Sequence, residues 1–270
     1  TYYRRAYLVR LWDLLVEKYP LEFWHQRIDG LRELIFDEQL EDIEEWGRSR
    51  PSANDPTAPA GFDPNLDRVR DHIAIRRNYL LNYLRNTEGF TGHDRLKITE
   101  VMYNPLGDDS AEFVELWNNS GEAIDISGWT VDGLGASEFA FPADTVVAEN
   151  EVIVLARDPD VFSGIYGNVG RVFGPYPGKL SDDGETLRVK DAGPGYPATV
   201  DWLRFETNDP WPGRADGLGY SLELFGVVPE LDNDHPEFWR ESVSLGGSPG
   251  FVHFEGLDVP HFRRGNCNND

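Results

Sequence analysis

Acidic and amide side chains in turn-rich segments are the first residues in this sequence that could do chemistry. The run Asp-Asn-Asp at 232–234 has the most ligand-like spacing, and acidic pairs at 108–109 and 182–183 lie in similar surroundings. Calcium prefers several hard oxygen ligands from one concave loop, so Asp232 and Asp234 are candidate calcium ligands. Such runs are also typical of ordinary turns, and the pattern alone leaves both interpretations open.

Tryptophan rings could supply flat surfaces on which sugars stack. Most of those in the second part of the chain should be core or corner residues, because each ring buries a large area; they are Trp117, Trp129, Trp202, Trp211 and Trp239. Trp211 lies between two prolines in an expected loop. It is therefore the best candidate for an exposed ring and for glycan binding.

The sequence lacks the common signatures of catalysis. It has no HExxH zinc motif, no Gly-x-Ser-x-Gly turn and no glycine-rich phosphate loop. Glu112 and Glu115 lie three residues apart and should face opposite sides of a strand, so they do not indicate a glycosidase pair. His25 and His72 lie in expected helices without a paired carboxylate motif. We therefore expect no catalytic residue in this chain.

Charge and cysteine content exclude several classes of protein. The formal net charge is −23, and residues 94–270 carry −20 of it, with 12 basic against 32 acidic side chains. Such a surface repels phosphate backbones, which argues against a nucleic-acid partner. The lone Cys267 rules out an internal disulfide and a Cys-based zinc site. No stretch reaches the ~20 apolar residues that a membrane-spanning helix needs.

Two kinds of hydrophobic period divide the elements that must position these residues. Apolar residues recur at helical spacing from Tyr3 to Leu15, from Trp24 to Trp46 and from Leu66 to Leu84. Pro20 should end the first helix, and Asp63-Pro64 should start the third after a loop. From Leu96 onwards, short β-branched and aromatic runs alternate with Asn-Pro, Asn-Ser-Gly and Asp-Gly turns, which predicts a sandwich or barrel.

The β-rich part resembles the lamin tail domain family over about residues 96–250. The matching segments occur in order: ITEVMYNP (98–105), EFVELWNNSGEAIDISGWTV (112–131), FAFPADTVVAENEVIVLA (139–156), LSDDGETLRVKD (180–191), VDWLRF (200–205), WPGRADGLGYSLEL (211–224) and GGSPG (246–250). This resemblance implies an all-β immunoglobulin-like sandwich, and the helical periods place an α-helical subdomain before it. It also implies a binding or attachment module without an active site.

The helical part resembles the C-terminal end of the CotH-type atypical kinases of bacterial secreted proteins, over about residues 1–90. The segments that carry this resemblance are IDGLRELI (28–35), DIEEWGRSR (42–50) and IAIRRNYLLNYL (73–84). It implies that the nucleotide site and the metal site of such a kinase would lie upstream of Thr1. The alternative function is therefore a C-terminal fragment of a secreted Ser/Thr kinase.

The last residues, FRRGNCNND (262–270), resemble the start of a dockerin-type calcium repeat. Such loops place oxygen ligands at positions 1, 3 and 5, which would be Asn266, Asn268 and Asp270. The loop is incomplete, and a polar, frayed terminus is the alternative. This end and the opening without Met lead us to expect a fragment of a longer protein.

Together these patterns predict a helical region over 1–88, a linker over 89–95, a sandwich over 96–252 and a tail over 253–270. We expect a monomeric, non-catalytic binding, adhesion or spacer module. The resemblances place it in a secreted or cell-surface bacterial protein, with a protein or a glycan at the cell surface as partner and calcium as the only candidate cofactor.

Overall fold

The computed structural model describes residues 2–46, 59–90, 95–135, 137–193, 195–225 and 235–252. The chain divides into two compact units. One unit is Arg10–Phe90, and the other combines Thr1–Val9 with Thr91–Asp270.

The first part of the chain is helical, as its period predicts. Its elements are α1 (Tyr2–Asp13), a π-helical turn (Leu14–Lys18), α2 (Leu21–Trp46) and α3 (Pro59–Glu88). The first helical run ends before Pro20, and α2 ends at Trp46, where the apolar stripe stops. The predicted start of the third helix at Asp63-Pro64 is wrong, because α3 begins at Pro59. Proline is favoured at the first position of a helix, and both Pro59 and Pro64 satisfy this rule. The rule alone therefore does not decide which of the two begins the helix.

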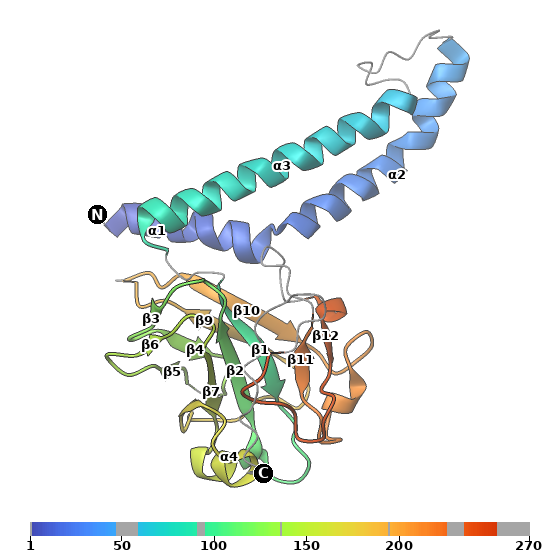
Figure 1. The fold of residues 1–270 in the computed structure, drawn as a ribbon. Helices are drawn as coiled ribbons and strands as arrows, with labels where there is room; N and C mark the ends of the chain where they lie inside the picture. The colour runs from blue at the N-terminus through green and yellow to red at the C-terminus, as the bar shows by residue number, and fades with distance from the viewer. Residues whose placement is uncertain are drawn as a thin grey trace, which may run out of the picture. The chain divides into compact units, whose positions relative to one another are not determined.

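The helical unit Arg10–Phe90 has a core of its own. Helices α2 and α3 lie side by side (Figure 1). The rings of Trp12 and Phe90 stack with centroids 5.2 Å apart, and both are fully buried. The guanidinium of Arg77 donates to the carbonyl of Leu15 at 3.2 Å. In the described residues, no helix combines the length and the apolar character needed to cross a membrane.

The second unit is built from short strands, as the turn spacing predicts. The strands are β1 (Leu96–Met102), β2 (Phe113–Asn118), β3 (Ile124–Asp125), β4 (Thr130–Asp132), β5 (Phe139–Ala140), β6 (Val146–Val147), β7 (Val152–Ala156), β8 (Arg171–Phe173), β9 (Glu185–Lys190), β10 (Thr199–Phe205), β11 (Leu222–Leu224) and β12 (Trp239–Glu241). Short helical segments connect them: η2 (Asp109–Ala111), α4 (Pro159–Tyr166), η3 (Gly213–Ala215) and η4 (Pro236–Phe238).

Two main sheets form the sandwich. One has six strands in the order β12-β11-β1-β2-β7-β8, and the other has four in the order β10-β9-β4-β5. Strands β3 and β6 form a separate pair. Neighbouring strands are antiparallel except β7 and β8, which are parallel. The predicted immunoglobulin-like sandwich after a helical region is confirmed.

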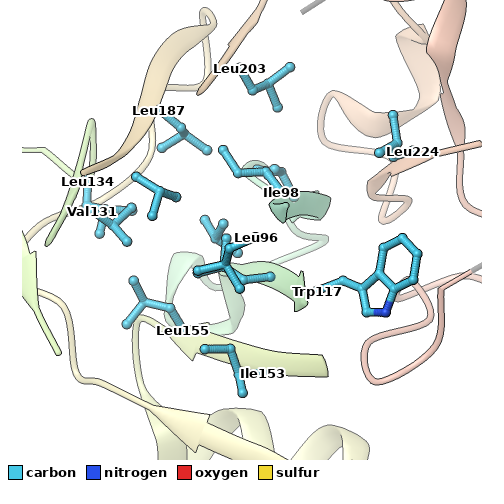
Figure 2. Packing of buried hydrophobic residues seen from close by; sticks show 14 of the residues in the cluster. Leu96, Ile98, Trp117, Val131, Leu134, Ile153, Leu155, Leu187, Leu203 and Leu224 are labelled. Carbon is cyan, nitrogen blue, oxygen red and sulfur yellow. The ribbon is translucent and has the colours of Figure 1, made fainter. Parts of the chain in front are cut away.

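The core lies between the two sheets. Figure 2 shows Leu96, Ile98 and Leu155 from the six-stranded sheet beside Val131 and Leu187 from the four-stranded sheet. All five are buried. Successive side chains of a strand point to opposite faces of its sheet, so every second side chain enters this core and the others lie on the opposite face.

The opposite face of the six-stranded sheet, called the outer face below, is also covered. Helix α4 packs Phe162 on Phe113 of β2, with ring centroids 5.5 Å apart, in a second buried cluster with Met102 and Val154. The turn and strand pattern of the sequence did not indicate this helix. The crossover from β7 to the parallel strand β8 contains α4, because parallel neighbours cannot be joined by a tight hairpin.

Candidate functional site

Three glutamates form a row across the outer face, and we refer to Glu100, Glu115 and Glu223 as the glutamate cluster. They lie on β1, β2 and β11, and Glu100 is directly opposite both Glu115 and Glu223 in the register of the strands. Residues directly opposite each other in antiparallel strands project from the same face, with Cβ atoms ~5 Å apart. The sheet therefore brings three carboxylates together from segments that are distant in sequence.

The local sequence explains why these acids point away from the core. Each is the single acidic residue of a largely apolar strand, within TEV, VEL and LEL. A register shift between Ile98 and Glu100 marks a bulge in β1. Bulges re-aim side chains, and here the hydroxyl of Thr99 donates to Glu115 at 2.7 Å.

A segment near the end of the described chain covers the cluster, and we refer to residues 244–250 as the covering segment. The backbone N–H of Ser248 donates to Oε1 of Glu100 at 2.8 Å, and that of Gly250 donates to Oε2 of Glu115 at 2.6 Å. The hydroxyl of Ser248 donates to Glu223 at 2.6 Å. The covering segment thus contacts each of the three carboxylates.

Side chains of the sheet complete the hydrogen bonding of the cluster. Ser221, just before β11, donates its hydroxyl to Oε1 of Glu100. Arg240 of β12 donates its Nε to Oε2 of Glu223 at 3.1 Å. Glu100, Glu115 and Glu223 are only 1%, 0% and 2% exposed.

Burial changes the acidity of two of these groups. It raises the pKa of Glu115 to about 8, although the hydrogen bonds from Thr99 and Gly250 oppose the shift. Burial, followed by the neighbouring Glu115 carboxylate, raises the pKa of Glu100 well above its ordinary value. Both effects disfavour the ionised form, because a buried carboxylate loses the solvation of its charge.

The geometry of the cluster suits structural rather than chemical work. Close carboxylates can act as acid and nucleophile on a sugar, but a substrate must reach them. Here the covering segment occupies that approach and uses the carboxylate oxygens as acceptors for its own N–H and O–H groups. The cluster therefore organises this part of the chain.

Glu112 is a further buried carboxylate with structural partners. It accepts hydrogen bonds from Arg157, from the hydroxyl of Tyr176 and from the N–H of Leu180, at 3.0, 2.9 and 2.8 Å. Burial raises its pKa, and the donors at Leu180 and Tyr176 oppose that shift. Glu112 and Glu115 have separate sets of partners, so the two acids do not share a site.

The structure describes only some of the residues that the sequence suggested as metal ligands or as a glycan site. Asp232, Asp234, Asn266, Asn268 and Asp270 lie outside the described residues. Within the described ranges, no group of three or more His, Cys, Asp or Glu side chains could hold a metal ion.

The expectation that Trp211 is exposed is wrong. Its side chain is 6% exposed and belongs to the core between the sheets. Neighbouring prolines predict a loop but do not fix the direction of the side chain, and the large apolar ring gains free energy by turning inward. The observation on which glycan binding at Trp211 rested is therefore removed. Trp117, Trp129 and Trp239 are also buried, whereas Trp202 is half-buried.

The acidic pairs in the loops act locally. Asp108 accepts the N–H of Ser110 at 2.8 Å and so caps the short helix η2. The side chain of Lys179 bridges Asp109 and Asp182 at 3.3 and 3.1 Å. These contacts fit the interpretation of such runs as turn residues.

Sequence reasoning missed the glutamate cluster. Glu115 was considered only as half of a glycosidase pair, and Glu100 and Glu223 were not singled out. A signal was present, because TEV, VEL and LEL each place one acid in a largely apolar strand. Charged residues are almost never fully buried without partners, so this pattern could have indicated a shared buried site.

Comparison with known families finds a similarity for most of the sandwich. Residues 91–202 match the family model of the Lamin Tail Domain. The matched region starts before β1 and ends within β10, so it covers most of the strands of both main sheets. None of the curated proteins matches the chain. Lamin tail domains are immunoglobulin-like modules of the binding or spacer type, and a carboxylate cluster that is closed to solvent is consistent with such a module.

Proposed function

We propose that this chain is a non-catalytic binding, adhesion or spacer module of a secreted or cell-surface multidomain bacterial protein. The lamin-tail-like sandwich supports the modular role. The resemblances of the helical part and of the last residues are the basis for the extracellular setting.

The burial of the acidic residues carries the non-catalytic part of the proposal. The three acids of the glutamate cluster are at most 2% exposed, and the chain itself supplies their hydrogen-bond donors. A general acid or nucleophile must instead come within hydrogen-bond distance of a substrate. These carboxylates lack that access while the covering segment is in place.

The charge of the module guides the choice of partner. Residues 94–270 have a formal charge of −20, which disfavours nucleic acids. The proposed partner is a protein or a glycan at the cell surface. Calcium is the proposed ion for the loop and tail that contain Asp232, Asp234 and Asn266, since hard oxygen ligands suit this cation.

Titration calorimetry of the full chain tests these roles separately. We expect no heat on addition of magnesium-ATP and no transfer of labelled phosphate to a Ser/Thr peptide. Phosphate transfer that depends on ATP would overturn the proposal in favour of the kinase alternative. Heat with calcium, together with a rise in Tm, would support a calcium-stabilised module, and an Asp232→Asn/Asp234→Asn variant would then locate the ion.

A direct binding test uses the immobilised chain against arrays of glycans and of purified extracellular protein domains. We expect saturable binding by a member of one array and not by double-stranded DNA. Stronger binding of DNA at moderate salt would contradict the role that we infer from charge.

A further inference from the structure

The covering segment depends on the glutamate cluster for much of its anchoring. Ser248 and Gly250 use backbone N–H groups to bind Glu100 and Glu115, and the hydroxyl of Ser248 binds Glu223. Tyr166 of α4 adds a further anchor, since its hydroxyl donates to the carbonyl of Gly246 at 2.5 Å. Gly247 approaches Oε1 of Glu100 so closely that a Cβ atom at this position would clash.

The titratable groups near Glu100 lie on several neighbouring elements. Glu115 faces it from β2, Glu223 from β11, Arg240 from β12 through its ion pair with Glu223, and Tyr166 from α4. The covering segment, Ser-Leu-Gly-Gly-Ser-Pro-Gly, has no titratable side chain. Burial raises the pKa of Tyr166, so its phenol stays neutral at physiological pH.

If all three acids of the glutamate cluster were ionised, their negative charge would exceed the single positive charge of the Arg240 guanidinium. Glu223 is the acid that is paired with Arg240. Oε2 of Glu100 is buried and, in the described part of the chain, has no hydrogen-bond partner. An unpartnered buried oxygen is much less costly on a neutral acid than on an anion. The geometry therefore favours a retained proton on the pair Glu100 and Glu115.

We propose that the glutamate cluster is a proton-dependent latch, which holds the covering segment on the outer face while at least one of Glu100 and Glu115 is protonated and releases it when both are ionised. Release exposes the carboxylates to water and so restores the solvation that the anions lack when covered. The proposal is independent of the binding or spacer role.

The direction of the pH dependence follows from linkage. In the released state, both acids should titrate near their ordinary pKa of 4.5, whereas in the closed state the pKa of Glu115 is about 8 and that of Glu100 is also raised. The closed state thus binds more protons than the released state between these values. Its stability relative to the released state is greatest at low pH and falls as pH rises through this window.

The test is a pH series of amide protection factors by NMR on the full chain, from about pH 6 to about pH 9.5. Protection factors correct for the intrinsic base catalysis of exchange. For Ser248 and Gly250 we expect a fall of up to about tenfold per pH unit for each proton released. Amides in the core strands should stay protected, which separates release of the segment from unfolding.

Glu100→Gln is the decisive variant. Its carbonyl oxygen can accept the same hydrogen bonds from Ser221 and Ser248, and its amide group replaces the unpartnered oxygen. We expect this neutral variant to have a shallower pH dependence of protection at Ser248 and Gly250. The exposed Glu122→Gln removes the same charge elsewhere in the sandwich and should behave like the wild type.

Two results would overturn the latch. One is an unchanged protection of Ser248 and Gly250 in the wild type up to the alkaline end of the series. The other is the same loss of protection in the wild type and in Glu100→Gln. Carbon-13 shifts of the side-chain carboxyls provide an independent check, because ionisation of both Glu100 and Glu115 below neutral pH would also contradict the proposal.

Discussion

At the scale of residues, one buried ion pair connects the two sheets of the sandwich. Lys97 on β1 and Asp201 on β10 join the two sheets through an ion pair of 3.0 Å, with side chains that are 5% and 4% exposed. The second oxygen of Asp201 accepts the N–H of Ile98 at 2.8 Å, next to the bulge in β1. The carboxylate therefore satisfies both a buried cation and a backbone donor, so the loss of either partner should be costly.

Asp201→Ala should lower the free energy of unfolding by about 3–5 kcal/mol, because it leaves the Lys97 ammonium buried without this partner. The double variant Lys97→Met/Asp201→Ala should recover part of the loss, since it also removes the orphaned charge. Urea unfolding of the full chain, followed by near-ultraviolet circular dichroism, measures both values. Equal stabilities of Asp201→Ala and the wild type would show that the pair contributes nothing.

At the scale of elements, α4 depends on its first turn. Asp158 caps the helix by accepting the N–H groups of Asp160 and Val161 at 3.0 and 3.1 Å, and Pro159 occupies the start of the helix. This cap holds the buried Phe162 over β2. The short helix therefore depends on both its cap and its contact with the sheet, because an isolated helix of this length is unstable.

Asp158→Ala should destabilise the chain by about 1 kcal/mol through the loss of the cap. Asp160→Ala is the matched control, because it removes an exposed acid from the same turn without removing the cap. It should cost about 0.3–1 kcal/mol through the helix dipole alone. Urea midpoints of the two variants provide the comparison, and a larger effect of Asp160→Ala would contradict the role of Asp158.

At the scale of the whole molecule, charge is divided unequally between the two parts of the chain. Residues 1–93 carry −3 and residues 94–270 carry −20. Self-repulsion destabilises a compact state of high net charge. The acidic sandwich should therefore respond to salt more strongly than the helices.

Added sodium chloride should raise the Tm of the sandwich, because the Debye length shortens from ~10 Å at 0.1 M to ~3 Å at 1 M. The helical signal at 222 nm should shift less than the near-ultraviolet signal, to which the sandwich contributes five of the eight tryptophans. Potassium chloride is the control, since screening depends on ionic strength and not on the cation. A Tm that falls with salt would contradict the dominance of self-repulsion.

The sequence by itself determined the two classes of structure and the similarity of the sandwich to the Lamin Tail Domain model. Helical and strand periods are local properties, so they predicted the helix that reaches Trp46 and the strands near Ile98 and Val114. Local rules were less successful where two signals competed. Asp63-Pro64 indicated a helix start although the helix begins at Pro59, and Asp158-Pro159, a start signal of the same kind, was overlooked.

The tertiary structure decided which polar residues are buried together. Ser248 binds Glu100 across a separation of 148 residues, and Gly250 binds Glu115 across 135. A side chain's neighbours at such distances depend on strand order and register, which no short window of sequence contains. For the same reason, prolines beside Trp211 indicated a loop, but only the packing of the two sheets placed its ring in the core.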